Sequence, residues 1–166
     1  MGLFGPSKIK ITPHAFVKTQ LDIIFSPIFI ETEKKNFARL SKEILFLQRV
    51  SVDKYIREFQ NATYNLFQIA WDRTIPYDVF IKYGLNMFND PRVKAVNNGT
   101  YDMALSKAQE AGLDTFGYIS AMFLTQLTPD EDAGAENIKL VKFYKDSFTS
   151  SYIGFEALIK QYKFIY

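Results

Sequence analysis

Apolar residues recur at helical spacing along most of the chain, most regularly in its first half. After Ser51 they fall three or four positions apart, which places them on one face of a helix. Ser51 is a favourable N-cap residue, and Asp53 complements the partial positive charge of the first turn. The pattern predicts a long amphipathic helix that begins at Ser51 and packs through Val52, Tyr55, Ile56, Phe59, Ala62, Leu66 and Ile69.

Similar patterns predict further helices on both sides of this one. Thr12-Pro13 combines an N-cap with a proline at the first helical position, so a helix should run to about Phe25, where Ser26-Pro27 ends or kinks it. In the other segments, turn and capping residues alternate with helical periodicity. Their predicted ranges are 32–50, 77–88, 92–96, 100–111, 114–127, 128–148 and a final helix after Thr149-Ser150-Ser151.

Strand-type alternation is confined to Lys8–Thr12, which is too short for a sheet on its own. The sequence therefore predicts an all-α fold: an irregular bundle of about eight helices in a single domain. Residues 1–12 are expected to form an extended N-terminal arm and residues 13–166 the helical domain.

The amino-acid composition excludes several classes of site and of protein. The 166 residues include no cysteine, which excludes disulfides, zinc–thiolate sites and iron–sulfur clusters. The longest apolar stretch, residues 23–30, is far shorter than the roughly 20 residues that span a bilayer. With no secretory signal pattern at the N-terminus, we expect a soluble, cytoplasmic protein with an aromatic-rich core of 16 Phe and 10 Tyr.

Motifs for catalysis or cofactor binding are missing from the sequence. His14 is the single histidine, and a solvated role fits it better than catalysis. The acidic run from Asp130 to Glu136 departs from the EF-hand pattern at Gly134, and helix N-terminal charge complementation explains it. No glycine-rich phosphate loop is present. We therefore expect no catalytic residue, no metal and no cofactor, and the sequence does not favour an enzyme.

Two groups of residues are candidates for contacts with a ligand or a partner. The first surrounds Pro76, where polar and aromatic residues concentrate at a predicted helix corner; a local Asp–Arg ion pair is the simpler interpretation. The second is the C-terminal tail, which ends on large apolar residues that would serve either to dock a partner or to close the protein's own core. The candidate pocket is Trp71, Asp72, Arg73, Tyr77 and Asp78, and the candidate partner contact is Tyr162, Phe164, Ile165 and Tyr166.

Three functions remain open from the sequence. The first is a non-enzymatic helical protein that interacts with a protein partner or with itself, as an accessory subunit would. The second is a binding module for an apolar or aromatic small molecule, held in a cavity among the Phe and Tyr residues. The third is a nucleic-acid-associated protein, which is disfavoured because acidic groups intersperse the basic helices and the pI is only 8.6. Its phosphate contacts would be Lys34, Lys35, Arg39, Lys42, Lys139, Lys142 and Lys145.

Overall fold

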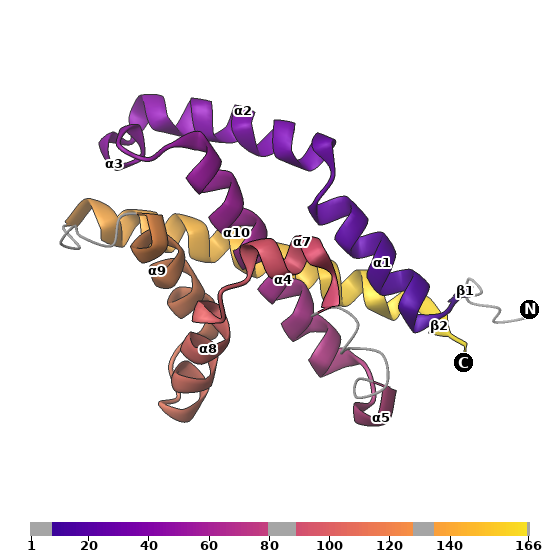
Figure 1. The fold of residues 1–166 in the computed structure, drawn as a ribbon. Coiled ribbons are helices and arrows are strands. Elements are labelled where there is room, and N and C mark those ends of the chain that lie inside the picture. The colour runs from indigo at the N-terminus through magenta and orange to yellow at the C-terminus, as the bar shows by residue number, and fades with distance from the viewer. Residues whose placement is uncertain (1–7, 80–88, 128–134, 166) are drawn as a thin grey trace, which may run out of the picture.

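Two long helices, α4 (Val52–Thr74) and α10 (Ala135–Lys160), cross at the centre of the fold (Figure 1). The computed structural model describes residues 8–79, 89–127 and 135–165. Tyr55 lies against Tyr144, and twelve positions further along α4 Phe67 lies against Phe155. Because the paired residue numbers rise together, the two helices run in the same general direction.

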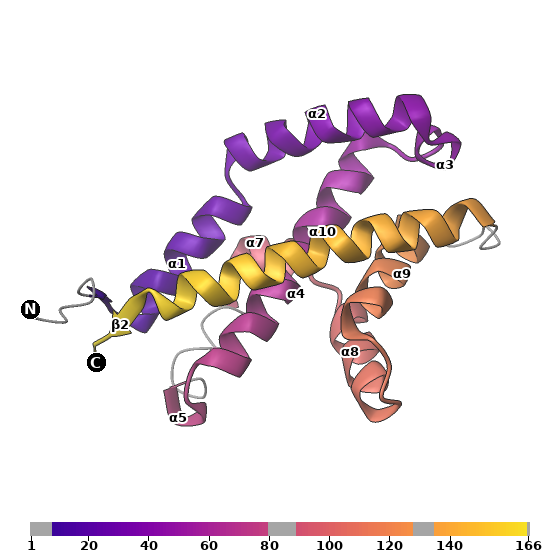
Figure 2. The same cartoon turned by 180° about the vertical axis from the view of Figure 1, so that it is seen from behind.

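The remaining helices pack around this crossing, which confirms the prediction of an all-α fold. Seen from behind, α10 lies across α4, and α2 (Pro27–Glu43) passes along the upper edge (Figure 2). No helix in the described ranges is both long and apolar enough to cross a membrane. The other helices are α1 (Pro13–Ile24), α2 (Pro27–Glu43), α3 (Leu45–Gln48), α5 (Tyr77–Val79), α7 (Pro91–Val96), α8 (Thr100–Glu110) and α9 (Thr115–Leu127).

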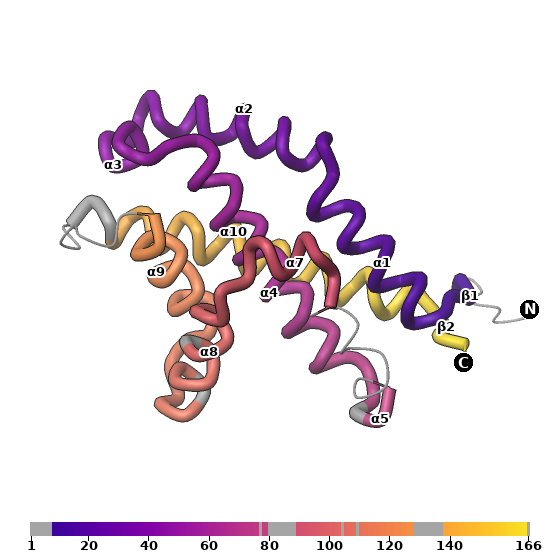
Figure 3. Tube along the Cα trace, viewed as in Figure 1, coloured from indigo at the N-terminus to yellow at the C-terminus, as the bar shows by residue number. Residues whose placement is uncertain are grey.

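Capping residues set several of the helix boundaries. The side-chain oxygen of Thr12 accepts a hydrogen bond from the Ala15 amide at 3.2 Å, and that of Ser51 accepts one from the Lys54 amide at 3.3 Å. Both predicted helix starts are therefore confirmed. Ser26 caps α2 in the same way, so this helix begins at Pro27, earlier than predicted, and the chain turns a corner between α1 and α2 that is visible in the tube of Figure 3.

One predicted helix break is wrong and another is confirmed. The helix α10 continues through Thr149-Ser150-Ser151, and within it the hydroxyls of Ser150 and Ser151 donate to the carbonyl oxygens of Asp146 and Ser147 at 2.9 and 3.1 Å. Serine that bonds back one turn is compatible with a helix interior. The break expected from the sequence within residues 71–76 is found, since α4 ends at Thr74 with Ile75 as its C-cap. The start of the predicted helix 128–148 and most of the predicted helix 77–88 lie outside the described residues.

A two-stranded parallel sheet joins the two ends of the described chain. Strand β1 (Ile9–Ile11) pairs with β2 (Tyr162–Phe164), with Ile9 opposite Tyr162 and Ile11 opposite Phe164. The amide of Ile165 donates to the carbonyl of Ile11 at 3.0 Å. The short alternation that sequence analysis found too small for a sheet thus finds its partner at the opposite end of the chain.

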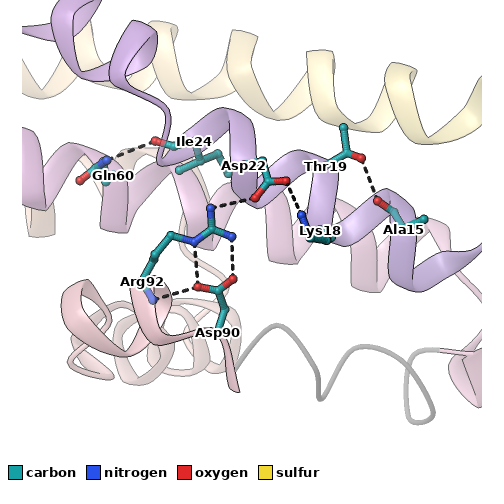
Figure 4. A network of polar contacts seen from close by, with 8 residues as sticks. All are labelled: Ala15, Lys18, Thr19, Asp22, Ile24, Gln60, Asp90 and Arg92. Carbon is teal, nitrogen blue, oxygen red and sulfur yellow. Dashed lines mark hydrogen bonds and ion pairs between the residues drawn. The ribbon is translucent and has the colours of Figure 1, made fainter.

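Helix α4 is buried on nearly every side, although its sequence predicts one apolar face. Its polar residues Gln60, Asn61 and Asn65 are 7%, 0% and 1% exposed. Gln60 donates to the carbonyl of Ile24 at 3.2 Å, which satisfies the free carbonyl at the end of α1 (Figure 4). Burial of polar side chains on α4 therefore depends on the surrounding helices, which the apolar period does not reveal.

An arginine ties α1 to α7 at the protein surface (Figure 4). Arg92 donates to both carboxylate oxygens of Asp90, at 3.0 and 2.7 Å, and to Asp22 at 2.9 Å. Lys18 also pairs with Asp22 at 2.8 Å. Hydrogen bonds from Lys18 and Arg92 lower the pKa of Asp22, while the bonds that Arg92 donates to Asp90 and Asp22 raise the pKa of Arg92, so Asp22 and Arg92 stay charged at neutral pH.

Candidate functional site

A cavity of about 190 Å³ opens between α2, α4 and α10. Helical spacing explains its walls: Glu33, Asn36 and Leu40 share one face of α2, and Tyr55 and Phe59 lie one turn apart on α4. We call this cavity the tyrosine pocket. Its complete lining is Glu33, Asn36, Arg39, Leu40, Tyr55, Phe59, Phe143, Tyr144 and Ser147.

Aromatic rings form most of the apolar wall of the tyrosine pocket. The rings of Tyr55 and Phe59 stack with centroids 5.8 Å apart, and Phe143 meets Tyr144 edge to face at 5.1 Å. Phe123 packs behind them, 5.7 Å from Tyr55 and 4.8 Å from Tyr144. Because neighbouring rings hold each other in place, this wall is organised before any ligand arrives.

The phenol groups of Tyr55 and Tyr144 are buried and share a hydrogen bond of 3.3 Å between their oxygens. Burial raises the pKa of Tyr144 to about 12 and that of Tyr55 further still. Both phenols are therefore protonated at neutral pH, and neither acts as a base or a nucleophile there.

A buried carboxylate completes the polar side of the tyrosine pocket. Glu33 is 9% exposed, and its Oε1 accepts a hydrogen bond from the Asn36 amide at 3.2 Å. Burial raises the pKa of Glu33, while the bond from Asn36 opposes that rise. Its negative charge in turn raises the pKa values of Tyr55 and Tyr144, which places the carboxylate close to both phenols.

A second polar cluster runs along α4 on the side that meets α8. Glu58, Asn61 and Asn65 lie on one helical face, and Tyr64 and Tyr101 are fully buried beside it. The Asn65 amide donates to Asn61 Oδ1 at 3.0 Å, whereas among the described residues Asn65 Oδ1 and the phenol oxygens of Tyr64 and Tyr101 have no hydrogen-bond partner. Buried polar atoms of this kind are usually satisfied by ordered water. We call this cluster the polar seam.

Two carboxylates at the open end of this seam repel each other. Partial burial of its carboxyl group and, to a smaller extent, the negative charge of Asp102 together raise the pKa of Asp72 to about 6. Burial also raises the pKa of Asp102. Asp72 therefore carries a proton far more readily than an ordinary aspartate does.

Three of the residues predicted to form a pocket around Pro76, namely Trp71, Asp72 and Arg73, do not converge. Trp71 is fully buried and stacks on Phe16 with centroids 5.7 Å apart, whereas Asp72 is exposed on the side of Asp102. Arg73 points elsewhere again, with its guanidinium 5.7 Å from the centre of the Tyr152 ring. Successive residues of a continuous helix are turned by about 100° from one another, which separates these three side chains. Asp78 is exposed in α5, and the side chain of Tyr77 lies outside the described residues.

The predicted C-terminal contact residues are divided between the core and the surface. Tyr162 and Phe164 pack edge to face on Phe16, with centroids 5.0 and 5.4 Å away. Phe164 also meets the Trp71 ring. Ile165 is 42% exposed, and Tyr166 lies outside the described residues. The tail thus closes the protein's own core through two of its rings, and a partner contact stays a prediction.

His14 and the basic helices have ordinary surface surroundings. His14 is exposed and lines a second cavity of about 300 Å³ between α1 and α7, together with Lys18 and Arg92 of the ion-pair network. Lys34 pairs with Glu31 at 3.1 Å, and Lys145 pairs with Asp114. In the part of the chain that the structure describes, no three acidic, histidine or cysteine side chains gather as metal ligands would.

Sequence reasoning missed the tyrosine pocket entirely. The sequence pattern identifies Phe59 as a packing residue and Arg39 as part of a basic face. No spacing in the sequence indicates that either residue lies near Glu33 or Tyr144. The available signal was the single acidic residue Glu33 on the otherwise apolar side of 32–50, one turn before Phe37. No protein-family model matches the chain, and no similarity to a curated protein or to a solved structure is found.

Proposed function

We propose that this protein binds a small, single-ring organic molecule in the tyrosine pocket without transforming it. The observation that carries the proposal is the cavity of about 190 Å³ walled by four aromatic rings. A dry cavity of about 150 Å³ holds benzene in another protein, so the volume suits one ring with a short substituent. The buried phenols of Tyr55 and Tyr144, which stay protonated at neutral pH, support binding without chemistry.

The test measures binding of two single-ring probes, 2-phenylethanol and 2-phenylethylamine, by ligand-observed NMR and calorimetry. We expect at least one probe to bind the parent protein, and Ser147→Leu to weaken that binding at least tenfold because the larger side chain fills the pocket. Ser150→Leu is the matched control, since Ser150 lies one turn further along α10 and is exposed. Failure of both probes to bind, or equal losses in the two variants, would contradict the proposal.

A protein partner is the second proposal, and a different observation favours it. Helix α10 keeps large apolar side chains at the surface, among them Ile138 at 70% and Ile153 at 57% exposure. Contiguous apolar patches on a protein surface mark association sites, and we propose that these side chains contribute to one. If the partner is a second copy of this chain, sedimentation should show a concentration-dependent dimer that Ile153→Glu disrupts. A monomer at every concentration would contradict self-association.

A further inference from the structure

Glu33 is a buried carboxylate that forms no ion pair with a cationic side chain of the described residues. Asn36 supplies a neutral hydrogen bond to its Oε1, and no lysine, arginine or histidine among the described residues forms an ion pair with it. Burying a carboxylate without a counter-ion is costly, which is why buried charges in proteins are normally paired. The wall of the tyrosine pocket therefore contains a carboxylate that no cationic side chain of the described residues neutralises.

The aromatic rings of the tyrosine pocket attract a cation, and so does the carboxylate of Glu33. The face of an aromatic ring carries partial negative charge, and a cation within about 6 Å of its centre is attracted to it. Tyr55, Phe59, Phe143 and Tyr144 all line the cavity that Glu33 borders. An ammonium group attached to a small apolar body would meet the carboxylate and the ring faces together.

The one cationic side chain in the lining does not take this place. Arg39 is exposed, so its guanidinium is solvated and its charge is screened by water. Glu33 and Arg39 both border the pocket from positions six residues apart on α2. Arg39 nevertheless forms no ion pair with Glu33 and is not among the groups that shift the pKa of Glu33.

We propose that the tyrosine pocket selects an organic ammonium cation on a single-ring or similarly small apolar body, with Glu33 as its counter-ion. This inference rests on the proposed function and names the ligand class of the same site. The ammonium donates to the carboxylate of Glu33, the apolar body lies against Phe59 and Phe143, and Asn36 holds the carboxylate in position.

The experiment compares 2-phenylethylamine, which is an ammonium at neutral pH, with 2-phenylethanol, which has nearly the same shape and no charge. Calorimetry with the parent protein should show the ammonium bound at least tenfold more tightly. Equal affinities, or a preference for the alcohol, would overturn the ammonium assignment while leaving the pocket itself supported. If neither compound binds, the proposed function fails as well.

Two variants on α2 assign the preference to a residue. Glu33→Gln keeps the shape and removes the charge, so it should abolish the preference for the ammonium while the alcohol binds as before. Glu31→Gln is the matched control: Glu31 is exposed, already pairs with Lys34, and should leave the preference unchanged. A preference that survives Glu33→Gln would overturn the role of Glu33. The comparison of the two compounds on the parent protein holds even if a variant does not fold.

Discussion

The hydroxyl groups of Tyr55 and Tyr144 meet 3.3 Å apart although 89 positions separate them in the chain. This contact joins α4 to α10 at the inner end of the tyrosine pocket. It also gives each buried phenol a hydrogen-bond partner, which a fully apolar environment would deny it. The pocket and the helix crossing therefore depend on the same pair of residues.

A double-mutant cycle should show that these two hydroxyls are coupled. Tyr144→Phe leaves the Tyr55 hydroxyl buried and unpaired, so we expect each single change to destabilise the protein by about 1–3 kcal/mol. The double variant should lose less than the sum of the two singles, with a coupling of about 0.5–1.5 kcal/mol in urea unfolding. Simple additivity would show that the hydroxyls do not interact.

Protonation of Asp72 should stabilise the protein. Because the pKa of Asp72 is about 6 in the folded state and about 4 in an ordinary aspartate, the folded state binds more protons between these values. The contribution of Asp72 to stability is therefore most favourable below that window and declines as the pH rises through it. We expect Asp72→Asn to raise the melting temperature at pH 7, with the gain shrinking as the pH falls towards 4.

The pKa of Asp114 is shifted in the opposite direction from that of Asp72, so its pH dependence should be opposite as well. A hydrogen bond from Lys145 lowers the pKa of Asp114, so its carboxylate stabilises the folded state at neutral pH and this contribution fades as the pH falls. Asp114→Asn should therefore lower the melting temperature at pH 7 and have little effect near pH 3. Parallel pH profiles for Asp72→Asn and Asp114→Asn would contradict both assignments.

The continuity of α10 can be tested at an exposed position. Ser150 lies in the segment where sequence analysis placed a break, and its hydroxyl donates within the helix to Asp146. In a continuous helix, Ser150→Gly should be about 0.5–1 kcal/mol less stable than Ser150→Ala in chemical denaturation. Equal stabilities of the two variants would be expected of a loop and would argue for the break.

The C-terminal strand should contribute measurably to stability. Phe164 packs on Phe16 and Trp71 from a half-buried position, so Phe164→Ala should cost about 1.5–3 kcal/mol. Ile165→Ala is the control: its side chain is 42% exposed, and its loss should change stability by less than about 0.5 kcal/mol. If Phe164→Ala leaves thermal stability intact but weakens association, the tail serves a partner instead of the core.

The sequence by itself determined the helical class and several helix boundaries. Thr12 and Ser51 are caps because a side-chain oxygen reaches an amide only three positions away. Gly99 and Gly112 lie in the turns before and after α8, with positive φ angles of 74° and 64° that glycine adopts without strain. These interactions are local in the chain, so spacing and residue type are enough to predict them. The apolar face of Val52 to Ile69 is predictable for the same reason.

Only the tertiary structure decided which faces meet and what lies between them. Glu33, Tyr55 and Tyr144 come from three separate helices, and no spacing within one helix shows that they border one cavity. The pairing of Ile9–Ile11 with Tyr162–Phe164 spans almost the whole chain, so the alternation in either segment alone is too short to predict it. Long-range packing also buries Asn61 and Asn65, which the apolar period of α4 by itself does not reveal.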